Sequence, residues 1–282
     1  MIIIEVTGGL GNQMFQYALY VKLKEMGKDV RLDLSDYRKG QSMRKFELGI
    51  FKTDYQAATP REINKYKKPD LLKRFSPVPL KEKIYIENLD EGYQEIVFSF
   101  DDMYLSGYWQ CEKYFADIRK TLLKKFTFPV ENSSMYEKKL SQIQMSQSVS
   151  IHVRRGDYLT EQNTKVYGNI CTLNYYRNAI SYIREKVKDA VFFLFTNDKD
   201  WVREKIYEEG MVIVDCNSND QDYLDMFLMS QCKHNIIANS SFSWWGAWLN
   251  QNIDKIVISP KKWFRNHKVA DQVCKGFITV ES

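Results

Sequence analysis

The stretch Ser150-Ile-His-Val-Arg-Arg-Gly-Asp-Tyr158 lies near the middle of the 282-residue chain. Polar and apolar side chains alternate through its first five residues, which predicts a β-strand with one apolar face. Gly156 indicates that the strand ends there, so that the guanidinium groups of Arg154 and Arg155 can turn toward one site at its carboxyl end. Two guanidinium groups suit a diphosphate, because each planar fork binds phosphate oxygens bidentately. An ion pair between either arginine and Asp157 that stabilises the strand end is the structural alternative.

Strands and helices alternate regularly after this stretch. Apolar strands are expected at residues 191–196, 212–215, 235–239 and 255–259, and helices at residues 173–187, 220–232 and 241–250. Short strands that alternate with helices predict a parallel sheet covered by helices.

The amino-terminal part predicts a second unit of the same kind. Residues 2–6 form an apolar strand, residues 14–27 have helical spacing, and residues 30–34 form another strand. The glycine-rich loop between the first strand and the helix has Met14 at the third glycine position of a dinucleotide-binding fingerprint, which argues against a nicotinamide or flavin enzyme. Residues 129–147 are polar and typical of a linker. We therefore predict an α/β protein with two domains, residues 1–147 and 148–282.

Composition and charge narrow the classes of function. The net charge of +5 fits small anionic ligands and falls short of a nucleic-acid-binding protein. No apolar stretch approaches the roughly 20 residues that span a bilayer. The five cysteines have no CxxC spacing, which favours a reducing cytoplasm. Residues 61–83 hold eight basic and three acidic residues, so peripheral association with the inner membrane face is an alternative to a solvated surface loop.

Polar residues follow the predicted strands of the second domain, at residues 154–157, 196–198, 215–219 and 239–243. Ligands of open parallel sheets bind at this edge. In Asn239-Ser-Ser-Phe-Ser243, hydroxyl and backbone N–H groups at a helix start can bind an anion, although a serine N-cap alone would explain them. Asp198 and Asp200 form a DxD pattern that could hold a divalent metal, but helix capping explains both acids as well.

Four motifs follow one another along nearly the whole chain: Gly8-Gly-Leu-Gly-Asn-Gln-Met-Phe-Gln-Tyr-Ala18, His152-Val-Arg-Arg-Gly-Asp-Tyr158, Phe195-Thr-Asn-Asp198 and Asn239-Ser-Ser-Phe-Ser-Trp-Trp-Gly-Ala-Trp248. Together with Gly107-Tyr-Trp-Gln110, they resemble the bacterial α-1,2-fucosyltransferases of glycosyltransferase family 11. The resemblance implies a GT-B fold, in which two Rossmann-like domains face each other across a cleft. It also implies metal-independent, inverting transfer of L-fucose from GDP-fucose, held by the carboxyl-terminal domain, to the 2-hydroxyl group of a terminal galactose.

With this resemblance, the chemistry of transfer suggests roles for individual residues. The donor-binding set is His152, Arg154, Arg155, Thr196, Asn197, Asp198, Asn239, Ser240, Ser241, Phe242 and Ser243. The set that orients the acceptor or the sugar is Gly11, Asn12, Gln13, Tyr108 and Trp109. The two arginines would neutralise the charge on the departing diphosphate, and Asp198 with Thr196 would read guanine.

A general base must deprotonate the galactose hydroxyl group, for which Asp157 is the first choice and Glu161 the second. No metal or other cofactor is expected besides the co-substrate GDP-fucose. Two alternatives stay open: another nucleotide-sugar-dependent glycosyltransferase with a metal at Asp198 and Asp200, and a non-catalytic sugar-binding module. Residues 40–100 carry no recognisable motif.

Overall fold

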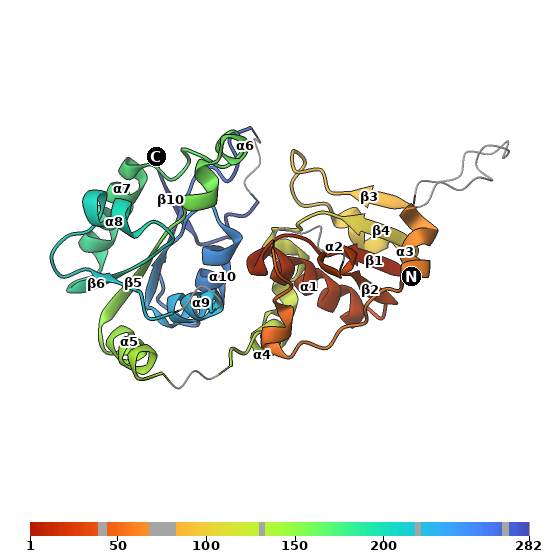
Figure 1. The fold of residues 1–282 in the computed structure, drawn as a ribbon, viewed down its shortest axis with the longest axis horizontal. Coiled ribbons are helices and arrows are strands. Elements are labelled where there is room, and N and C mark those ends of the chain that lie inside the picture. Colours follow the sequence, from red (N-terminus) through yellow and green to blue (C-terminus); the bar gives the residue numbers. More distant parts are fainter. Residues whose placement is uncertain (39–43, 68–82, 130–132, 218–220, 267–270, 282) are drawn as a thin grey trace. The chain divides into compact units, whose positions relative to one another are not determined.

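The computed structural model describes residues 1–38, 44–67, 83–129, 133–217, 221–266 and 271–281. The chain divides into two units, Met1–Thr127 and Phe128–Ser282. Each unit contains one parallel β-sheet with helices packed on it (Figure 1). The predicted α/β class with two Rossmann-like domains is therefore confirmed.

The first unit is built on a four-stranded sheet. Its order is β2 (Val30–Asp33), β1 (Ile2–Glu5), β4 (Met103–Ser106), β3 (Ile84–Ile86), and every strand pair is parallel. The isoleucines of the central strand β1 are fully buried, as an apolar run covered on both faces requires. Helix α1 (Leu10–Glu25) packs on β1 and β2 and is buried along most of its length.

The other helical segments described in this unit are short. They are α2 (Ser35–Arg38), α3 (Pro60–Lys67), α4 (Arg119–Lys125) and 3-10 turns at Leu48–Phe51, Glu95–Ser99, Glu112–Tyr114 and Ala116–Ile118.

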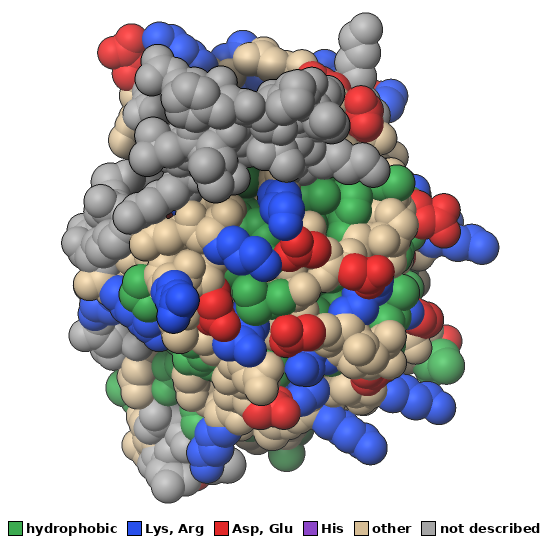
Figure 2. Space-filling view, turned by 90° about the vertical axis from the view of Figure 1, so that its right-hand side faces the viewer, with side chains coloured by type: hydrophobic (Ala, Val, Ile, Leu, Met, Phe, Trp, Pro, Cys, Tyr) green, Lys and Arg blue, Asp and Glu red, His purple; other side chains and the backbone are tan. Residues whose placement is uncertain are grey.

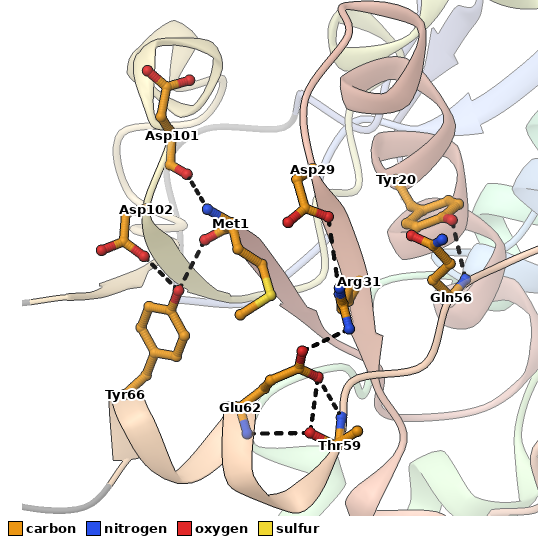
Figure 3. Close-up of polar contacts among 10 residues, drawn as sticks. All are labelled: Met1, Tyr20, Asp29, Arg31, Gln56, Thr59, Glu62, Tyr66, Asp101 and Asp102. Carbon is orange, nitrogen blue, oxygen red and sulfur yellow. Dashed lines mark hydrogen bonds and ion pairs between the residues drawn. The ribbon is translucent and has the colours of Figure 1, made fainter.

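Helix α3 begins with a capping box. The Glu62 carboxylate accepts hydrogen bonds from the Thr59 backbone N–H (2.8 Å) and hydroxyl (2.9 Å), while the Thr59 hydroxyl accepts one from the Glu62 N–H (3.3 Å) (Figure 3). Arg31 of β2 also donates to Glu62 at 2.6 Å. This contact links the start of α3 to the sheet.

The end of α3 is held by Tyr66. Its ring packs against Ile3 and Tyr104, and its hydroxyl donates to the Met1 carbonyl oxygen at 2.9 Å and to the Asp102 carboxylate (Figure 3). A helix of only two turns gains most of its stability from such tertiary contacts.

The basic segment 61–83 is described only in part, since residues 68–82 lie outside the described residues. Three of its lysines pair with carboxylates: Lys65 and Lys83 with Asp102, and Lys67 with Glu5 and Asp33. Figure 2 shows acidic and basic side chains intermixed on the face of the first unit that carries α3 and β3. These lysines therefore have carboxylate partners on the first unit, and membrane association stays a prediction.

The second unit contains a six-stranded parallel sheet. Its order is β10 (Ile278–Val280), β9 (Val257–Pro260), β8 (His234–Ile236), β5 (Gln147–Val153), β6 (Ala190–Thr196), β7 (Val212–Ile213). From β5 the chain builds the sheet first toward β7 and then, from β8, in the opposite direction. The carboxyl ends of β5 and β8 are therefore a topological switch point, where ligands of open α/β sheets bind.

The helices of this unit are α5 (Ser134–Met145), α6 (Glu161–Thr164), α7 (Leu173–Lys186), α8 (Lys199–Lys205), α9 (Asp222–Gln231) and α10 (Ser241–Leu249), with a 3-10 turn at Gly156–Leu159. Strand β5 is buried on both faces. Its apolar face packs with residues of α7 and α8, and its Ser150 hydroxyl, on the other face, accepts a hydrogen bond from Asn235 at 2.8 Å. Because the Ser150 hydroxyl is hydrogen-bonded, it is buried at little cost.

The boundary between the units differs from the predicted one. Residues 134–145, which we expected in a linker at 129–147, form helix α5. This helix packs on β5 and α9, where the ring of Tyr136 stacks on Phe227. The units therefore divide at residues 127 and 128 rather than at 147 and 148.

Candidate functional site

The start of helix α10 lies beside the carboxyl end of β5. The Phe242 ring packs on the His152 imidazole, with 5.7 Å between ring centroids. Ser240 occupies the N-cap position, and its side chain makes no capping hydrogen bond. The backbone N–H groups of Ser241, Phe242 and Ser243 likewise have no acceptor within the described residues. Unbonded amides at a helix start, together with the helix dipole, form an anion site.

His152 contributes an unsatisfied nitrogen to the same edge. Its side chain is buried, and within the described residues its Nδ1 atom has no hydrogen-bond partner. Burial, together with the charge of Arg154, lowers the pKa of His152 to about 3, so the imidazole is neutral at physiological pH. A buried nitrogen without a partner is costly, and a bound ligand that supplies the partner would remove that cost.

Arg155 is held in place without using its terminal nitrogens. Its Nε atom donates to Asp198 Oδ2 at 3.0 Å, and its guanidinium carbon lies 4.2 Å from the centroid of the Trp201 ring. Its backbone N–H donates to Asn197 Oδ1 at 3.0 Å. Within the described residues, both terminal nitrogens are without a hydrogen bond. The guanidinium group is therefore oriented and still has its terminal N–H donors available.

Arg154 directly follows the end of β5 at Val153. Its guanidinium carbon lies 5.8 Å from the centroid of the Tyr158 ring. The Tyr158 hydroxyl in turn donates to the Asn239 carbonyl oxygen at 3.0 Å. Arg154 is thus tied to the loop that leads into α10.

Three of the predicted donor-binding residues, Thr196, Asn197 and Asp198, hold Arg155 in its orientation. Asp198 caps α8 by accepting the Trp201 N–H at 3.1 Å, and its second oxygen takes the Arg155 bond. The Thr196 hydroxyl accepts the Asp198 N–H at 2.9 Å. With the Asn197 contact to the Arg155 backbone, the loop at the end of β6 orients the arginine, and guanine recognition by Thr196 and Asp198 stays a prediction.

The side chains of two predicted donor-binding residues make hydrogen bonds within the protein. The buried Asn239 amide donates to the carbonyl oxygens of Tyr167 and Trp263, at 3.2 and 3.1 Å. The Ser243 hydroxyl is fully buried and accepts the Ala238 N–H at 3.2 Å. Both side chains therefore fix the turn between β8 and α10, whereas the Ser243 backbone N–H has no acceptor within the described residues.

The structure describes the side chain of only one of the two candidate bases. The side chain of Asp157 lies outside the described residues. Glu161 begins α6, and its side chain is 91% exposed and pairs with Lys165 at 3.2 Å. The assignment of the base to either residue therefore stays a prediction.

The predicted acceptor-side residues fall into two groups. Gln13 is fully buried and donates to the carbonyl oxygens of Gly8 and Lys45, at 2.9 and 2.8 Å, so it holds the glycine loop rather than a sugar. Trp109 is also fully buried, which corrects our expectation of a sugar-facing ring. Gly11 is buried in the first turn of α1. The fully buried side chains of Gln13 and Trp109 cannot contact a sugar, whereas the role of Gly11 stays a prediction.

Asn12 and Tyr108 remain at the carboxyl edge of the first sheet. Asn12 Oδ1 accepts a hydrogen bond from Gln110 at 2.8 Å, and Tyr108 is half-buried. Its backbone N–H donates to a Glu87 carboxylate oxygen at 2.6 Å. No sequence motif marks Glu87, although Gly107 beside Tyr108 signals a close approach of another chain segment.

Asp225 is a second acid that sequence reasoning missed. It lies in α9 and accepts a hydrogen bond from Asn217. Burial, and to a lesser degree the charge of Asp222, raises its pKa to about 7. Helix position alone could not signal this, because acids in the first turn of a helix are common.

The DxD acids are not arranged as a pair. The Asp200 side chain is fully exposed and pairs with Arg203 at 3.4 Å, whereas Asp198 is bonded to Arg155. Within the described ranges, no group of three or more His, Cys, Asp or Glu side chains could hold a metal ion. In the same residues, no helix is long and apolar enough to cross a bilayer.

The fold and this edge define a class of protein: a two-unit α/β protein with N–H donors that have no acceptor among the described residues at the switch point of its second sheet. The profile of Glycosyl transferase family 11 matches residues 1–279. The chain therefore belongs to glycosyltransferase family 11, and the predicted family is confirmed.

Relatives of this chain carry more specific names. Alpha-1,2-colitosyltransferase of Escherichia coli is 35% identical over 288 residues, which cover 95% of this chain and 94% of the relative. O-antigen biosynthesis glycosyltransferase WbnK of Escherichia coli is 33% identical over 306 residues, covering 98% and 99%. Galactoside alpha-(1,2)-fucosyltransferase 1 of Leontopithecus chrysomelas is 25% identical over 251 residues, covering 86% and 63%. Among solved structures, a mutant of Arabidopsis thaliana FUT1 in complex with GDP aligns with 93% of this chain and 71% of its own, at 11% identity and a TM-score of 0.47.

Proposed function

We propose that this glycosyltransferase moves L-fucose from GDP-fucose to the 2-hydroxyl group of a terminal galactose, with inversion and without a metal. The observation that carries the proposal is the edge formed by Arg155 and the start of α10. There, two terminal guanidinium nitrogens and the first helix amides are all without acceptors in the described residues. A diphosphate supplies acceptors for both groups of donors.

The leaving group sets the main electrostatic demand of the reaction. As the bond between the fucose anomeric carbon and the diphosphate oxygen breaks, negative charge grows on GDP. Arg154, Arg155 and the N–H groups of Ser241 and Phe242 would stabilise this charge as preorganised donors. The neutral His152 imidazole would complete the pocket by bonding to the donor through its unsatisfied Nδ1 atom.

The acceptor hydroxyl group must lose a proton during the in-line attack. Asp157 and Glu161 follow the diphosphate arginines in sequence and are the two candidates for the base. Guanine would lie toward the end of β6, where Thr196 and Asp198 offer a hydroxyl group and carboxylate oxygens. Recognition of the donor at both ends would make the reaction specific for a guanine nucleotide.

A second donor is supported by a specific observation, the 35% identity to an alpha-1,2-colitosyltransferase. Colitose is L-fucose without the 3-hydroxyl group, so the same diphosphate pocket could serve either sugar. The choice between them would depend on contacts to one hydroxyl group.

Parallel turnover assays with GDP-fucose and GDP-colitose over a panel of galactosides test the proposal. Linkage analysis of the product should show an α-1,2 bond, and the rate should be unaffected by EDTA. Loss of activity in EDTA that Mn²⁺ restores would favour the metal-dependent alternative at Asp198 and Asp200. Calorimetry that detects no binding of GDP would instead favour the non-catalytic sugar-binding module.

A further inference from the structure

A carboxylate of the first unit is held in an unusual environment at the carboxyl edge of its sheet. Glu87 directly follows β3, and one of its oxygens, Oε2, accepts the backbone N–H groups of Tyr108 (2.6 Å) and Trp109 (3.0 Å). Within the described residues, Glu87 forms no ion pair, and its other oxygen, Oε1, has no hydrogen-bond partner. Oε1 is not fully buried, so it retains some exposure to solvent.

The local sequence is adapted to hold this carboxylate. A Cβ atom at Gly107 would lie 2.5 Å from the Glu87 Cβ and 2.7 Å from Oε2, so only glycine leaves room for the contact. The Gly107 carbonyl oxygen accepts a hydrogen bond from Gln16 of α1 at 3.0 Å. Trp109 adopts the left-handed conformation, with φ of 57°, and its buried ring stacks on Tyr85. Strained and tightly fitted backbone of this kind is found where a site is preorganised.

The position of Glu87 is costly for the folded protein. Burial raises the pKa of its carboxyl group, which means that the charged form is destabilised, and among the described residues no cation pairs with it. The other carboxylates at this sheet edge are satisfied: Glu5 and Asp33 both accept from Lys67 and Tyr104. Glu87 is thus a partly buried carboxylate that has no cationic partner among the described residues, whereas its neighbours have one. This difference points to a ligand that supplies a hydrogen-bond donor to Glu87.

We propose that Glu87 and Tyr108 form an acceptor-sugar subsite on the first unit, in which Glu87 Oε1 accepts a hydrogen bond from a hydroxyl group of the acceptor. The inference rests on the proposed function, since it takes the acceptor to be a galactoside. A neutral sugar fits because it brings hydroxyl donors for the carboxylate and C–H groups for the half-buried tyrosine ring. An anionic ligand does not fit, because Glu87 has no neighbouring cation among the described residues.

Glu87→Gln is the informative change, because glutamine keeps an oxygen for the two backbone N–H groups and puts an NH2 donor in place of Oε1. The KM for lactose or methyl β-D-galactopyranoside should rise tenfold or more, as for the loss of a hydrogen bond to a charged group. The KM for the nucleotide sugar and the affinity for GDP should stay within about twofold of wild type. Glu91→Gln, an exposed acid of the same loop, is the matched control and should change none of these values.

Saturation-transfer NMR with methyl β-D-galactopyranoside gives a readout without turnover. The signal should be strong with wild-type protein and GDP, weak with Glu87→Gln, and weak with Tyr108→Ala, which keeps the acid. If wild type turns over but the glutamine variant keeps its acceptor KM, Glu87 is only a backbone clamp and the inference is wrong. If Glu87→Gln does not fold, an unchanged acceptor KM in Tyr108→Ala overturns the subsite. If wild type transfers no sugar to any galactoside, the proposed function fails instead.

Discussion

The carboxyl edges of the two sheets have the same architecture and opposite chemistry. In the second unit, the edge presents donors that have no acceptor among the described residues: the terminal nitrogens of Arg155 and the first amides of α10. In the first unit, β1 and β2 end on the carboxylates of Glu5 and Asp33, and Glu87 adds a third beyond β3. A parallel sheet thus provides only the location, and we expect the residues after each strand to decide which ligand binds there: an anion at the second edge and a neutral sugar at the first.

Removing the cation from the second edge should have the largest effect. Arg155→Ala should lower kcat by about 100-fold to 1000-fold, because a preorganised donor to the departing diphosphate is lost. The thermal midpoint should fall by only a few degrees, because Asp198 keeps its capping bond to the Trp201 N–H when the partly buried ion pair with Arg155 is lost. Steady-state kinetics and thermal melts measure both values.

Arg203→Ala is the control for this change. Arg203 lies on α8 and pairs with the exposed Asp200, so its removal should leave kcat unaltered. A folded Arg155→Ala enzyme with near-normal kcat would contradict the donor role of this edge.

His152→Phe should separate function from stability at the same edge. The change removes the unsatisfied Nδ1 atom, so the free energy of unfolding should stay constant or rise, while the Kd for GDP should increase about tenfold. His234→Phe provides the opposite case, because His234 Nδ1 accepts the Ile256 N–H at 3.0 Å and its loss should lower stability without changing GDP binding. Calorimetry measures the Kd for GDP, and denaturant titrations measure the stability of both variants. If His152→Phe loses stability without a change in Kd, His152 does not belong to the donor site.

The sequence predicted the regular part of the second unit well. Helices expected at 173–187 and 241–250 occur at Leu173–Lys186 and Ser241–Leu249, because strong apolar periodicity and capping residues mark them. It missed α5, although Tyr136, Leu140 and Ile143 have helical spacing, because the surrounding residues are polar. Here the periodicity was the better guide than the composition.

The sequence predicted candidate site residues that belong to one continuous segment, but it did not predict those that depend on contacts between distant segments. Arg155 and the start of α10 each follow from a local pattern. Glu87 does not follow from a local pattern, because its carboxylate is held by the backbone N–H groups of Tyr108 and Trp109, which lie beyond strand β4 in the sequence. The burial of Gln13 and Trp109 likewise depends on tertiary packing that no motif records.

Asp225 is a partly buried acid of the second unit, and it should make the stability of the protein depend on pH. Its folded-state pKa of about 7 lies above the ordinary value of 3.8, so the folded state binds the extra proton between these pH values. Stability should therefore fall as pH rises from about 4 to about 7 and then level off. Asp225→Asn keeps an acceptor for Asn217 and should abolish this loss, which raises the thermal midpoint by a few degrees at pH 8 and leaves it unchanged at pH 4.

Asp200→Asn, at the exposed start of α8, controls for the loss of one negative charge and should show no such pH dependence. Thermal melts of the three proteins from pH 4 to pH 8 give the comparison. Equal midpoints of wild type and Asp225→Asn across this range would mean that Asp225 is ionised as readily in the folded as in the unfolded chain.

The smallest effect is expected away from both edges, at the capping box of α3. Thr59→Ala removes the hydroxyl group that accepts the Glu62 N–H, so the free energy of unfolding should fall by about 1 kcal/mol. Both KM values and kcat should stay as in wild type, because Glu62 still accepts from Arg31 and keeps α3 on the sheet. Thr59→Ser retains the cap and should restore stability. A loss of acceptor affinity in Thr59→Ala would show that the sheet face under α3 is coupled to the carboxylate edge. The difference between the two edges would then depend on the packing of the sheets as well as on the residues that follow each strand.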